Sequence, residues 1–188
     1  MKLEHICKSY GEKTVLSKIS FEIGPGVTCL MAPSGSGKTT LLRILLGLEQ
    51  ADSGTLTDMP RRWAVVFQED RLLEQLDAMG NLRFALGESF EPTAAKKMLE
   101  SLGLEPTEGG AVRTYSGGMK RRLALARALL KPADAIALDE PFTGLDEENR
   151  AKAIACIQKA AENRTVLLIT HEPQDAAALD AAVIHILA

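Results

Sequence analysis

Ala32-Pro33-Ser34-Gly35-Ser36-Gly37-Lys38-Thr39-Thr40 is the stretch that decides the fold. It follows the apolar run Val27–Met31, which is typical of a buried strand, and it leads into Thr39–Leu48. That second segment is aliphatic on nearly all sides and predicts a buried helix that ends near Gly47. Small residues let successive backbone N–H groups converge on an anion, and a helix start adds its positive end. We therefore expect a phosphate-binding loop, with Lys38 on the outer phosphates and the Thr39 hydroxyl on Mg²⁺.

The first position of this loop is Ala32, where the phosphate-loop pattern has glycine. If the position required a positive φ, alanine would cost about 1 kcal/mol. If the residue is extended, alanine costs little, and the sequence leaves both conformations open. A plain glycine turn between a strand and a helix is the simpler alternative, but it does not require a Lys-Thr pair directly after the last glycine.

Apolar strands and helical segments alternate along most of the chain, which favours an α/β fold. We expect a mostly parallel sheet with helices on both faces, and two or three antiparallel strands within the first 30 residues. A short strand near Thr55–Thr57 and a final strand at Ala182–Leu187 are also expected. Residues 71–114 break the alternation with two short helices, near 77–86 and 92–102. We therefore predict a single domain, 1–188, whose core comprises 1–70 and 115–188 and whose residues 71–114 are a helical insertion.

A second predicted strand, Ala135–Leu138, is followed directly by two acidic residues, Asp139 and Glu140. Neighbouring side chains on a strand point to opposite faces, so the two carboxylates should have different roles. Asp139 suits the shell of a metal ion, and Glu140 suits a base that polarises an attacking water. Helix capping is the simpler role for either residue, but Pro141 follows at once.

A second glycine motif, Ser116-Gly117-Gly118, opens a helix that runs to Leu130. Its first turn carries Lys120, Arg121 and Arg122, although cations oppose the dipole at that end of a helix. We expect a concentrated anion site there, and a solvated basic face is the alternative.

Composition narrows the class of protein. The 188 residues carry a formal net charge of −3. A charge so near balance produces no long-range electrostatic field that would favour nucleic acid as the main partner. No apolar run approaches the roughly 18 residues of a membrane helix, and the N-terminus has no apolar core of a signal peptide. Three cysteines without C-x-x-C spacing suggest buried, reduced thiols. We expect a soluble, intracellular protein.

Together these motifs resemble the ATP-binding subunit of ABC transporters, a P-loop NTPase with a RecA-like fold. The phosphate loop corresponds to Walker A, Ala135–Glu140 to Walker B and Ser116-Gly117-Gly118 to the signature. Tyr115 replaces the usual Leu of that signature, and Met119 replaces the usual Gln. Four further positions occur in the order that the family has, and they are the stacking aromatic Tyr10, the Q-loop Gln68, the D-loop Thr143-Gly144-Leu145-Asp146 and the switch His171.

The resemblance implies Mg²⁺-dependent hydrolysis of ATP between two subunits placed head to tail. It implies that Glu140, His171 and Gln68 are catalytic and that Thr39, Gln68 and Asp139 hold Mg²⁺. The residues implied to bind ATP are Tyr10, Ala32, Pro33, Ser34, Gly35, Ser36, Gly37, Lys38, Thr39 and Thr40. The implied signature contacts to the partner's ATP come from Ser116, Gly117 and Gly118.

Simpler roles remain open for these four further positions. His171 suits a satisfied histidine at a strand end. Tyr10 suits an ordinary strand-end aromatic, and Gln68 suits a solvated loop amide. Asp146 suits a cap of the helix that follows, which is compatible with a D-loop role.

The segment Val66–Leu73 is similar to that of bacterial importers of the nitrate, sulfonate and taurine type. This likeness implies import driven by ATP-dependent dimer closure, with a second, identical ATPase subunit, an integral membrane permease and an extracytoplasmic solute-binding protein as partners. The subunit would lie in the cytoplasm on the inner face of the membrane, and the permease would dock near Glu69–Arg83. The alternatives are a non-transport ABC ATPase, which couples ATP to protein assembly or nucleic-acid work, a small-molecule P-loop kinase and a non-hydrolysing binding module.

Overall fold

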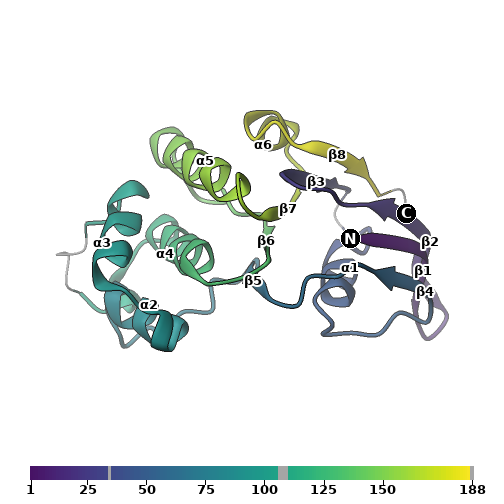
Figure 1. Ribbon diagram of the computed structural model, residues 1–188, viewed down its shortest axis with the longest axis horizontal. Coiled ribbons are helices and arrows are strands. Elements are labelled where there is room, and N and C mark those ends of the chain that lie inside the picture. Colours follow the sequence, from purple (N-terminus) through teal and green to yellow (C-terminus); the bar gives the residue numbers. More distant parts are fainter. Residues whose placement is uncertain (34, 106–109, 187–188) are drawn as a thin grey trace.

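A five-stranded parallel sheet forms the centre of the computed structural model, which describes residues 1–33, 35–105 and 110–186 (Figure 1). The strand order is β5-β6-β7-β3-β8, and every neighbouring pair is parallel, as the sequence predicts. The strands are β3 (Val27–Met31), β5 (Trp63–Val66), β6 (Ala135–Asp139), β7 (Thr165–Thr170) and β8 (Ala182–His185). The expected final strand extends to Leu187, which lies outside the described residues.

A smaller antiparallel sheet packs beside it, in the order β2-β1-β4. Two of its strands lie in the first 30 residues, as expected: β1 (Lys2–Tyr10) and β2 (Lys13–Glu22). The third, β4 (Ser53–Thr57), was expected as a strand, but its pairing with β1 joins residues about 50 positions apart. A local sequence pattern cannot show such a partner.

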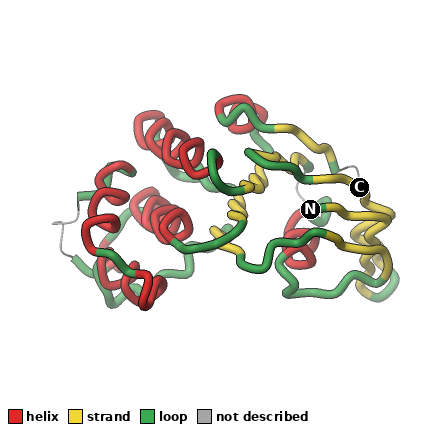
Figure 2. Tube along the Cα trace, viewed as in Figure 1, coloured by secondary structure: helices red, strands yellow, loops and turns green. Residues whose placement is uncertain are grey.

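The helices gather mostly at one end of the molecule and the strands at its centre and other end (Figure 2). They are α1 (Lys38–Leu45), α2 (Ala78–Leu86), α3 (Pro92–Ser101), α4 (Gly117–Leu130), α5 (Glu147–Ala161) and α6 (Pro173–Ala178). Short 3₁₀ turns cover Gly87–Ser89 and Val112–Thr114.

Alternation along the central strands divides the core into two layers. On β6 and β7, Ile136 and Leu168 pack with α4 and α5, whereas Ala137 and Ile169 pack with α1 and the antiparallel sheet. Figure 1 shows these elements on opposite sides of the sheet. The expected helices on both faces are therefore confirmed.

Helix α1 ends close to Gly47, where the sequence predicts its end. It begins at Lys38 and ends at Leu45. A turn closes the helix: the N–H of Gly47 donates to the Ile44 carbonyl and the N–H of Leu48 to the Arg43 carbonyl. The expected end near Gly47 is confirmed, because Gly47 has a positive φ directly after the C-cap Leu46.

The segment 71–114 contributes α2 and α3, which pack against α4. The division into a core and an insertion within one domain stays a prediction. Among the residues that the structure describes, no helix is both long and apolar enough to span a membrane.

Candidate active site

A cleft of about 780 Å³ lies at the carboxyl ends of the parallel strands, where ligands bind in open α/β sheets. Loops after four strands, β3, β5, β6 and β7, meet there, although their residues are up to about 140 positions apart in the chain. The described residues that line it are Lys13, Val15, Pro33, Gly35, Gly37, Lys38, Thr39, Thr40, Gln68, Asp139, Glu140, Thr143 and His171. The expected metal-binding and catalytic side chains therefore share one cavity.

The phosphate loop has the backbone that such a loop requires. Positive φ values occur at Gly35 and Gly37, and Ala32 is not among the described residues with a positive φ. The departure at Ala32 therefore costs little, and its side chain is buried in the core. A Cβ on Gly37 would lie 2.8 Å from Val15 Cγ1, so the loop also needs glycine to pack against β2. Ser34, an expected ATP contact, lies outside the described residues.

Side chains of the loop stabilise its turn from within. The Ser36 hydroxyl donates to the Pro33 carbonyl oxygen over 2.7 Å. The Lys38 ammonium donates to the carbonyl oxygens of Ala32 and Pro33 over 2.6 and 2.8 Å. An ammonium group on a flexible stem, at the first turn of α1, is placed to exchange these carbonyls for phosphate oxygens.

Asp139 and Glu140 both line the cleft, so the expectation that they face opposite ways is wrong. Asp139 is the last residue of β6, and Glu140 follows it with φ +49°. This left-handed conformation ends the strand alternation and turns the second carboxylate toward the first. Burial raises the pKa of Asp139, the charge of Glu140 adds to the rise, and Lys38 opposes it.

Glu140 is bonded to the residue expected to act as the switch. Its Oε1 lies 2.8 Å from Nδ1 of His171, and its Oε2 lies 3.4 Å from the Thr170 hydroxyl. The hydrogen bond from the imidazole and the charge of Glu140 raise the pKa of His171 above its ordinary value, with a smaller contribution from Glu172. The His171 side chain remains largely exposed to solvent at the cleft, and its contact with a bound phosphate stays a prediction.

A buried acid that the sequence analysis missed supports this arrangement. Asp175, at the start of α6, accepts a hydrogen bond of 2.8 Å from the Thr170 hydroxyl and pairs with Arg150 of α5. The Thr170 hydroxyl in turn accepts from the backbone N–H of Glu172. The segment around His171 is thus tied to α5 through side chains. No local signal identifies this pair, because its members are 25 residues apart.

Hard oxygen donors converge in the cleft: the Thr39 hydroxyl, the Gln68 amide and the Asp139 carboxylate. Such donors suit Mg²⁺, which uses one or two protein carboxylates together with substrate phosphates. The described ranges hold no cluster of three or more His, Cys, Asp or Glu side chains for a metal ion. The donor set therefore fits a magnesium ion that reaches the cleft with a nucleotide.

The signature residues do not line this cleft. Ser116 is the N-cap of α4, and its hydroxyl accepts from the N–H of Met119 over 3.2 Å. Ser116 and Gly117 are exposed on the surface. Gly118 packs so closely on the D-loop that a Cβ there would lie 2.8 Å from the Gly144 carbonyl oxygen. The motif is therefore presented outward and touches its own chain's D-loop.

The three cations after the signature form neither the expected anion site nor a solvated basic face. Lys120 pairs with Glu74 over 2.8 Å. Arg121 and Arg122 are buried, and their guanidinium groups donate to backbone carbonyls of distant loops. The local pattern misled because these acceptors lie 20 to 54 residues away in the sequence.

Asp146 caps α5, as the simpler alternative suggests. Its Oδ1 accepts from the N–H of Asn149 and its Oδ2 from the side-chain amide, each over 2.8 Å. These bonds lower the pKa of Asp146. The side chain is exposed near the signature, so its D-loop role stays a prediction.

Tyr10 lies at the end of β1, outside the described lining of the cleft. Its ring is about half exposed, its hydroxyl bonds to Glu49, and the Lys8 ammonium lies 5.6 Å from the ring centroid. Stacking on adenine stays a prediction for this residue. Lys13 and Val15, which do line the cleft, were missed because nothing in an alternating strand marks them.

Comparison with known proteins agrees with this geometry. The model of the family described as "ABC transporter" matches residues 16–143. An aliphatic sulfonates import ATP-binding protein of Rhodococcus jostii is 38% identical over 95% of this chain and 68% of its own length. A Nod factor export ATP-binding protein of Paraburkholderia xenovorans is also 38% identical, over 94% of this chain and 64% of its own.

Two solved structures share the fold. One is the dimeric structure of MJ0796, a bacterial ABC transporter cassette, with a TM-score of 0.85 and 25% identity. The other is the same cassette in a post-hydrolysis state with ADP and Pi, with a TM-score of 0.83 and 26% identity. Each comparison covers 98% of this chain and 93% of the cassette chain.

Proposed function

This chain belongs to the ABC transporter family as an ATP-binding and ATP-hydrolysing subunit, and we propose that two copies of it power solute import through a separate membrane permease. One observation carries the dimeric part of the proposal. The phosphate loop and the acidic residues line one cleft, whereas Ser116 and Gly117 face solvent elsewhere on the chain. Each ATP then lies between the cleft of one chain and the signature of the other.

Within the cleft, the residues divide the work of hydrolysis. Glu140 orients the attacking water and accepts its proton, while His171 contacts the γ-phosphate and keeps the carboxylate in place through Nδ1. Lys38 and the loop N–H groups bind the phosphates. Thr39, Gln68 and Asp139 would hold Mg²⁺, which would supply positive charge to the phosphate oxygens.

Dimer closure adds the partner's contribution. The Ser116 hydroxyl and the N-terminal amides of α4 place hydrogen-bond donors and a helix end against the γ-phosphate. This stabilisation exists only when both chains and the triphosphate are together. Hydrolysis removes the bridging phosphate, so the dimer opens, and this cycle of closing and opening drives the permease.

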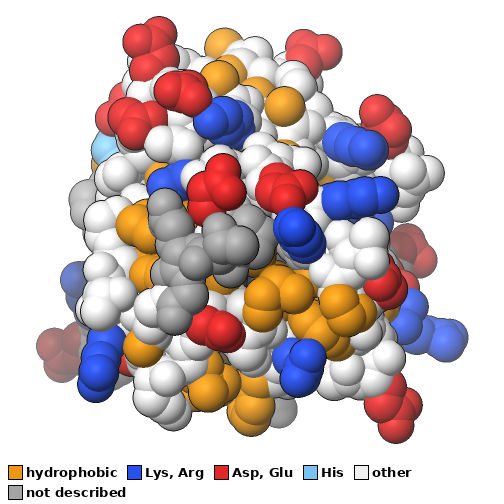
Figure 3. Space-filling model, turned by 90° about the vertical axis from the view of Figure 1, so that its left-hand side faces the viewer, with side chains coloured by type: hydrophobic (Ala, Val, Ile, Leu, Met, Phe, Trp, Pro, Cys, Tyr) orange, Lys and Arg blue, Asp and Glu red, His pale blue; other side chains and the backbone are white. Residues whose placement is uncertain are grey.

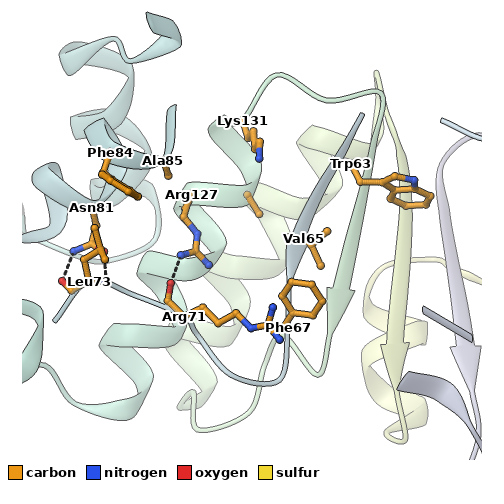
Figure 4. A pocket seen from close by; sticks show the side chains of 11 residues that line it. Trp63, Val65, Phe67, Arg71, Leu73, Asn81, Phe84, Ala85, Arg127 and Lys131 are labelled. Atoms are coloured by element: carbon orange, nitrogen blue, oxygen red, sulfur yellow. Dashed lines mark hydrogen bonds between the residues drawn. The ribbon is translucent and has the colours of Figure 1, made fainter. Parts of the chain in front are cut away.

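A groove on the helical side is the proposed docking site of that permease. It has a volume of about 380 Å³ between β5, α2 and α4 (Figure 4). Trp63 lines it from β5, and Phe67 lines it from the position directly after that strand. Phe84 of α2 projects into it with 73% of its surface exposed. On the end of the molecule that carries α2, hydrophobic side chains gather with Lys and Arg beside them (Figure 3).

The groove extends the docking range expected from sequence, Glu69–Arg83, to β5 and α4. Arg127 of α4 and Lys131, the C-cap residue of that helix, add positive charge to its apolar wall. A short cytoplasmic segment of the permease with an apolar anchor and an acidic flank is complementary to this surface. Docking there places the chain on the cytoplasmic face of the membrane, with a solute-binding protein on the other side.

Relatives named for aliphatic sulfonates indicate the solute to try first. We expect a strain that lacks this gene to stop growing on an alkanesulfonate as its sole sulfur source. The wild-type gene should restore growth, and Glu140→Gln should not. Phe84→Glu should also fail to restore growth, although its purified protein should keep its basal ATPase activity. Normal growth of the deleted strain would contradict sulfonate import, and reduced efflux of a solute from that strain would favour export.

A further inference from the structure

The loop that carries Gln68 is fastened to α4 by a buried arginine. Phe67 and Gln68 follow the last residue of β5, where the strand ladder ends, so their carbonyl oxygens need other partners. Nη1 of Arg121 donates to the Phe67 carbonyl oxygen and Nη2 to that of Gln68, each over 2.7 Å. The planar fork of a guanidinium can serve two successive carbonyls at once, whereas an ammonium is a point donor.

A second arginine of the same helix holds the rest of the loop. Arg127 donates to the carbonyl oxygen of Arg71 over 2.6 Å and to that of Asp70 over 2.8 Å (Figure 4). The two arginines together hold four of the five carbonyls of 67–71. The backbone around Gln68 is thus fixed to α4.

The environment of Arg121 indicates that its contacts are needed. Its side chain is only 6% exposed, and Nη1 lies 3.2 Å from Oδ1 of Asp70. Burying a guanidinium is unfavourable unless a counter-charge and hydrogen-bond acceptors surround it. The partners named here, two carbonyls and the Asp70 carboxylate, all belong to the Gln68 loop.

We propose that Arg121 is a positioning residue, which holds the Gln68 amide in the nucleotide cleft by fixing the backbone beneath it. The proposal rests on the role proposed for Gln68. Arg121 does not line the cleft itself. Helix α4 begins at the signature, which is proposed to contact the partner's ATP. The Arg121 guanidinium therefore also links that helix to the Gln68 loop of the chain's own ATP site.

A double-mutant cycle on turnover separates positioning from general support of the fold. Four proteins are compared at saturating Mg-ATP: wild type, Gln68→Ala, Arg121→Lys and the double variant. We expect each single change to lower kcat by roughly tenfold or more, as loss of supporting partners does at metal sites. The double variant should be no slower than Gln68→Ala alone, because Arg121 then has no amide to position.

Arg164 provides a matched control. It also donates to two backbone carbonyls, those of Leu129 and Lys131 at the far end of α4, over 2.9 and 3.3 Å. Arg164→Lys should lower the melting temperature and leave kcat unchanged, both alone and in the Gln68→Ala background.

Hydrogen exchange provides a readout that does not depend on turnover. Without nucleotide, amides of 67–71 should exchange faster in Arg121→Lys than in wild type, and at the wild-type rate in Arg164→Lys. Arg121→Gln, which removes the buried charge but keeps one donor, should give the same pattern if the lysine variant is too unstable to study.

Two results would overturn the role of Arg121: wild-type kcat in Arg121→Lys, or a double variant slowed by the product of the single effects. Wild-type turnover in Gln68→Ala would instead disprove the role of Gln68 itself. The two failures are therefore distinguishable.

Discussion

Nδ1 of His171 lies 2.8 Å from Oε1 of Glu140, so the imidazole and the carboxylate on one side of the cleft are bonded to each other. The two residues come from loops after neighbouring strands, β6 and β7. Thr170, the last residue of β7, also approaches the carboxylate and links it to the buried Asp175. The proposed base is thus held from one direction, and its remaining surface faces the cleft.

Replacing Glu140 by Gln keeps the size and the hydrogen-bonding capacity of the side chain but removes its basicity. We expect ATP binding near the wild-type level and turnover reduced by roughly 10²-fold or more, the range for loss of a general base. Equilibrium binding of a fluorescent ATP analogue and a phosphate-release assay measure the two properties. Turnover at the wild-type rate would rule out Glu140 as the base.

The ion pair also predicts a pH dependence. Since Glu140 raises the pKa of His171, the folded protein keeps a proton that the unfolded chain has already released above about pH 6.5. The stabilisation from this group is therefore complete below about pH 6.5 and is lost as the pH rises through the folded pKa.

NMR titration of the histidine ring protons tests this directly. The pKa of His171 should lie above the ordinary value in wild type and fall back in Glu140→Gln. In wild type the free energy of unfolding should fall over that pH window, and the fall should be smaller in Glu140→Gln. An unchanged pKa would show that the pair does not form in solution.

Met119 occupies the signature position where the family usually has glutamine, and we expect this departure to be neutral. Its backbone N–H bonds to the Ser116 hydroxyl, and this contact does not depend on the side chain. The Met119 side chain is half-buried against the core, and the proposed phosphate contacts come from Ser116 and the backbone, so Met119→Gln should change kcat/KM by less than about twofold. A large gain in activity would mean that the glutamine makes a phosphate contact that this chain lacks.

The two signature glycines should respond differently to alanine. At Gly118 the added Cβ would lie 2.8 Å from the Gly144 carbonyl oxygen, so the D-loop must move. We expect Gly118→Ala to cost about 1–3 kcal/mol of unfolding free energy, the usual range for overpacking. At Gly117 no atom lies within 4 Å of the added Cβ, and Gly117→Ala should leave stability unchanged. Equal denaturation midpoints for the two variants would contradict the close packing of the signature on the D-loop.

Sequence patterns predicted those parts of the fold that depend on neighbours in the chain. The apolar run before the glycine loop and the aliphatic helix after it identify the phosphate loop, because strand burial and helix periodicity are local properties. Gly47 also marks the end of α1, where a hydrogen-bonded turn closes the helix although apolar residues continue to Leu48.

What the sequence could not predict depends on partners far away in the chain. Arg121 and Arg122 have the pattern of a basic helix start, but both are buried and donate to distant carbonyls. Arg121 also pairs with the Asp70 carboxylate. Glu140 follows a strand whose alternation would send its side chain away from Asp139, and only its left-handed backbone brings it into the cleft. The cap at Asp146, set by Asn149 three residues on, was within reach of the sequence.

The central claim is that a complete ATP site requires two chains, and the mass of Glu140→Gln in solution tests it most directly. Without nucleotide the mass should be that of one chain, 20.3 kDa. With Mg-ATP it should rise to twice that value. Adding Ser116→Asp should abolish the rise, because aspartate keeps the helix cap but places a carboxylate against the partner's phosphate. A protein that binds Mg-ATP and remains a single chain would contradict the account.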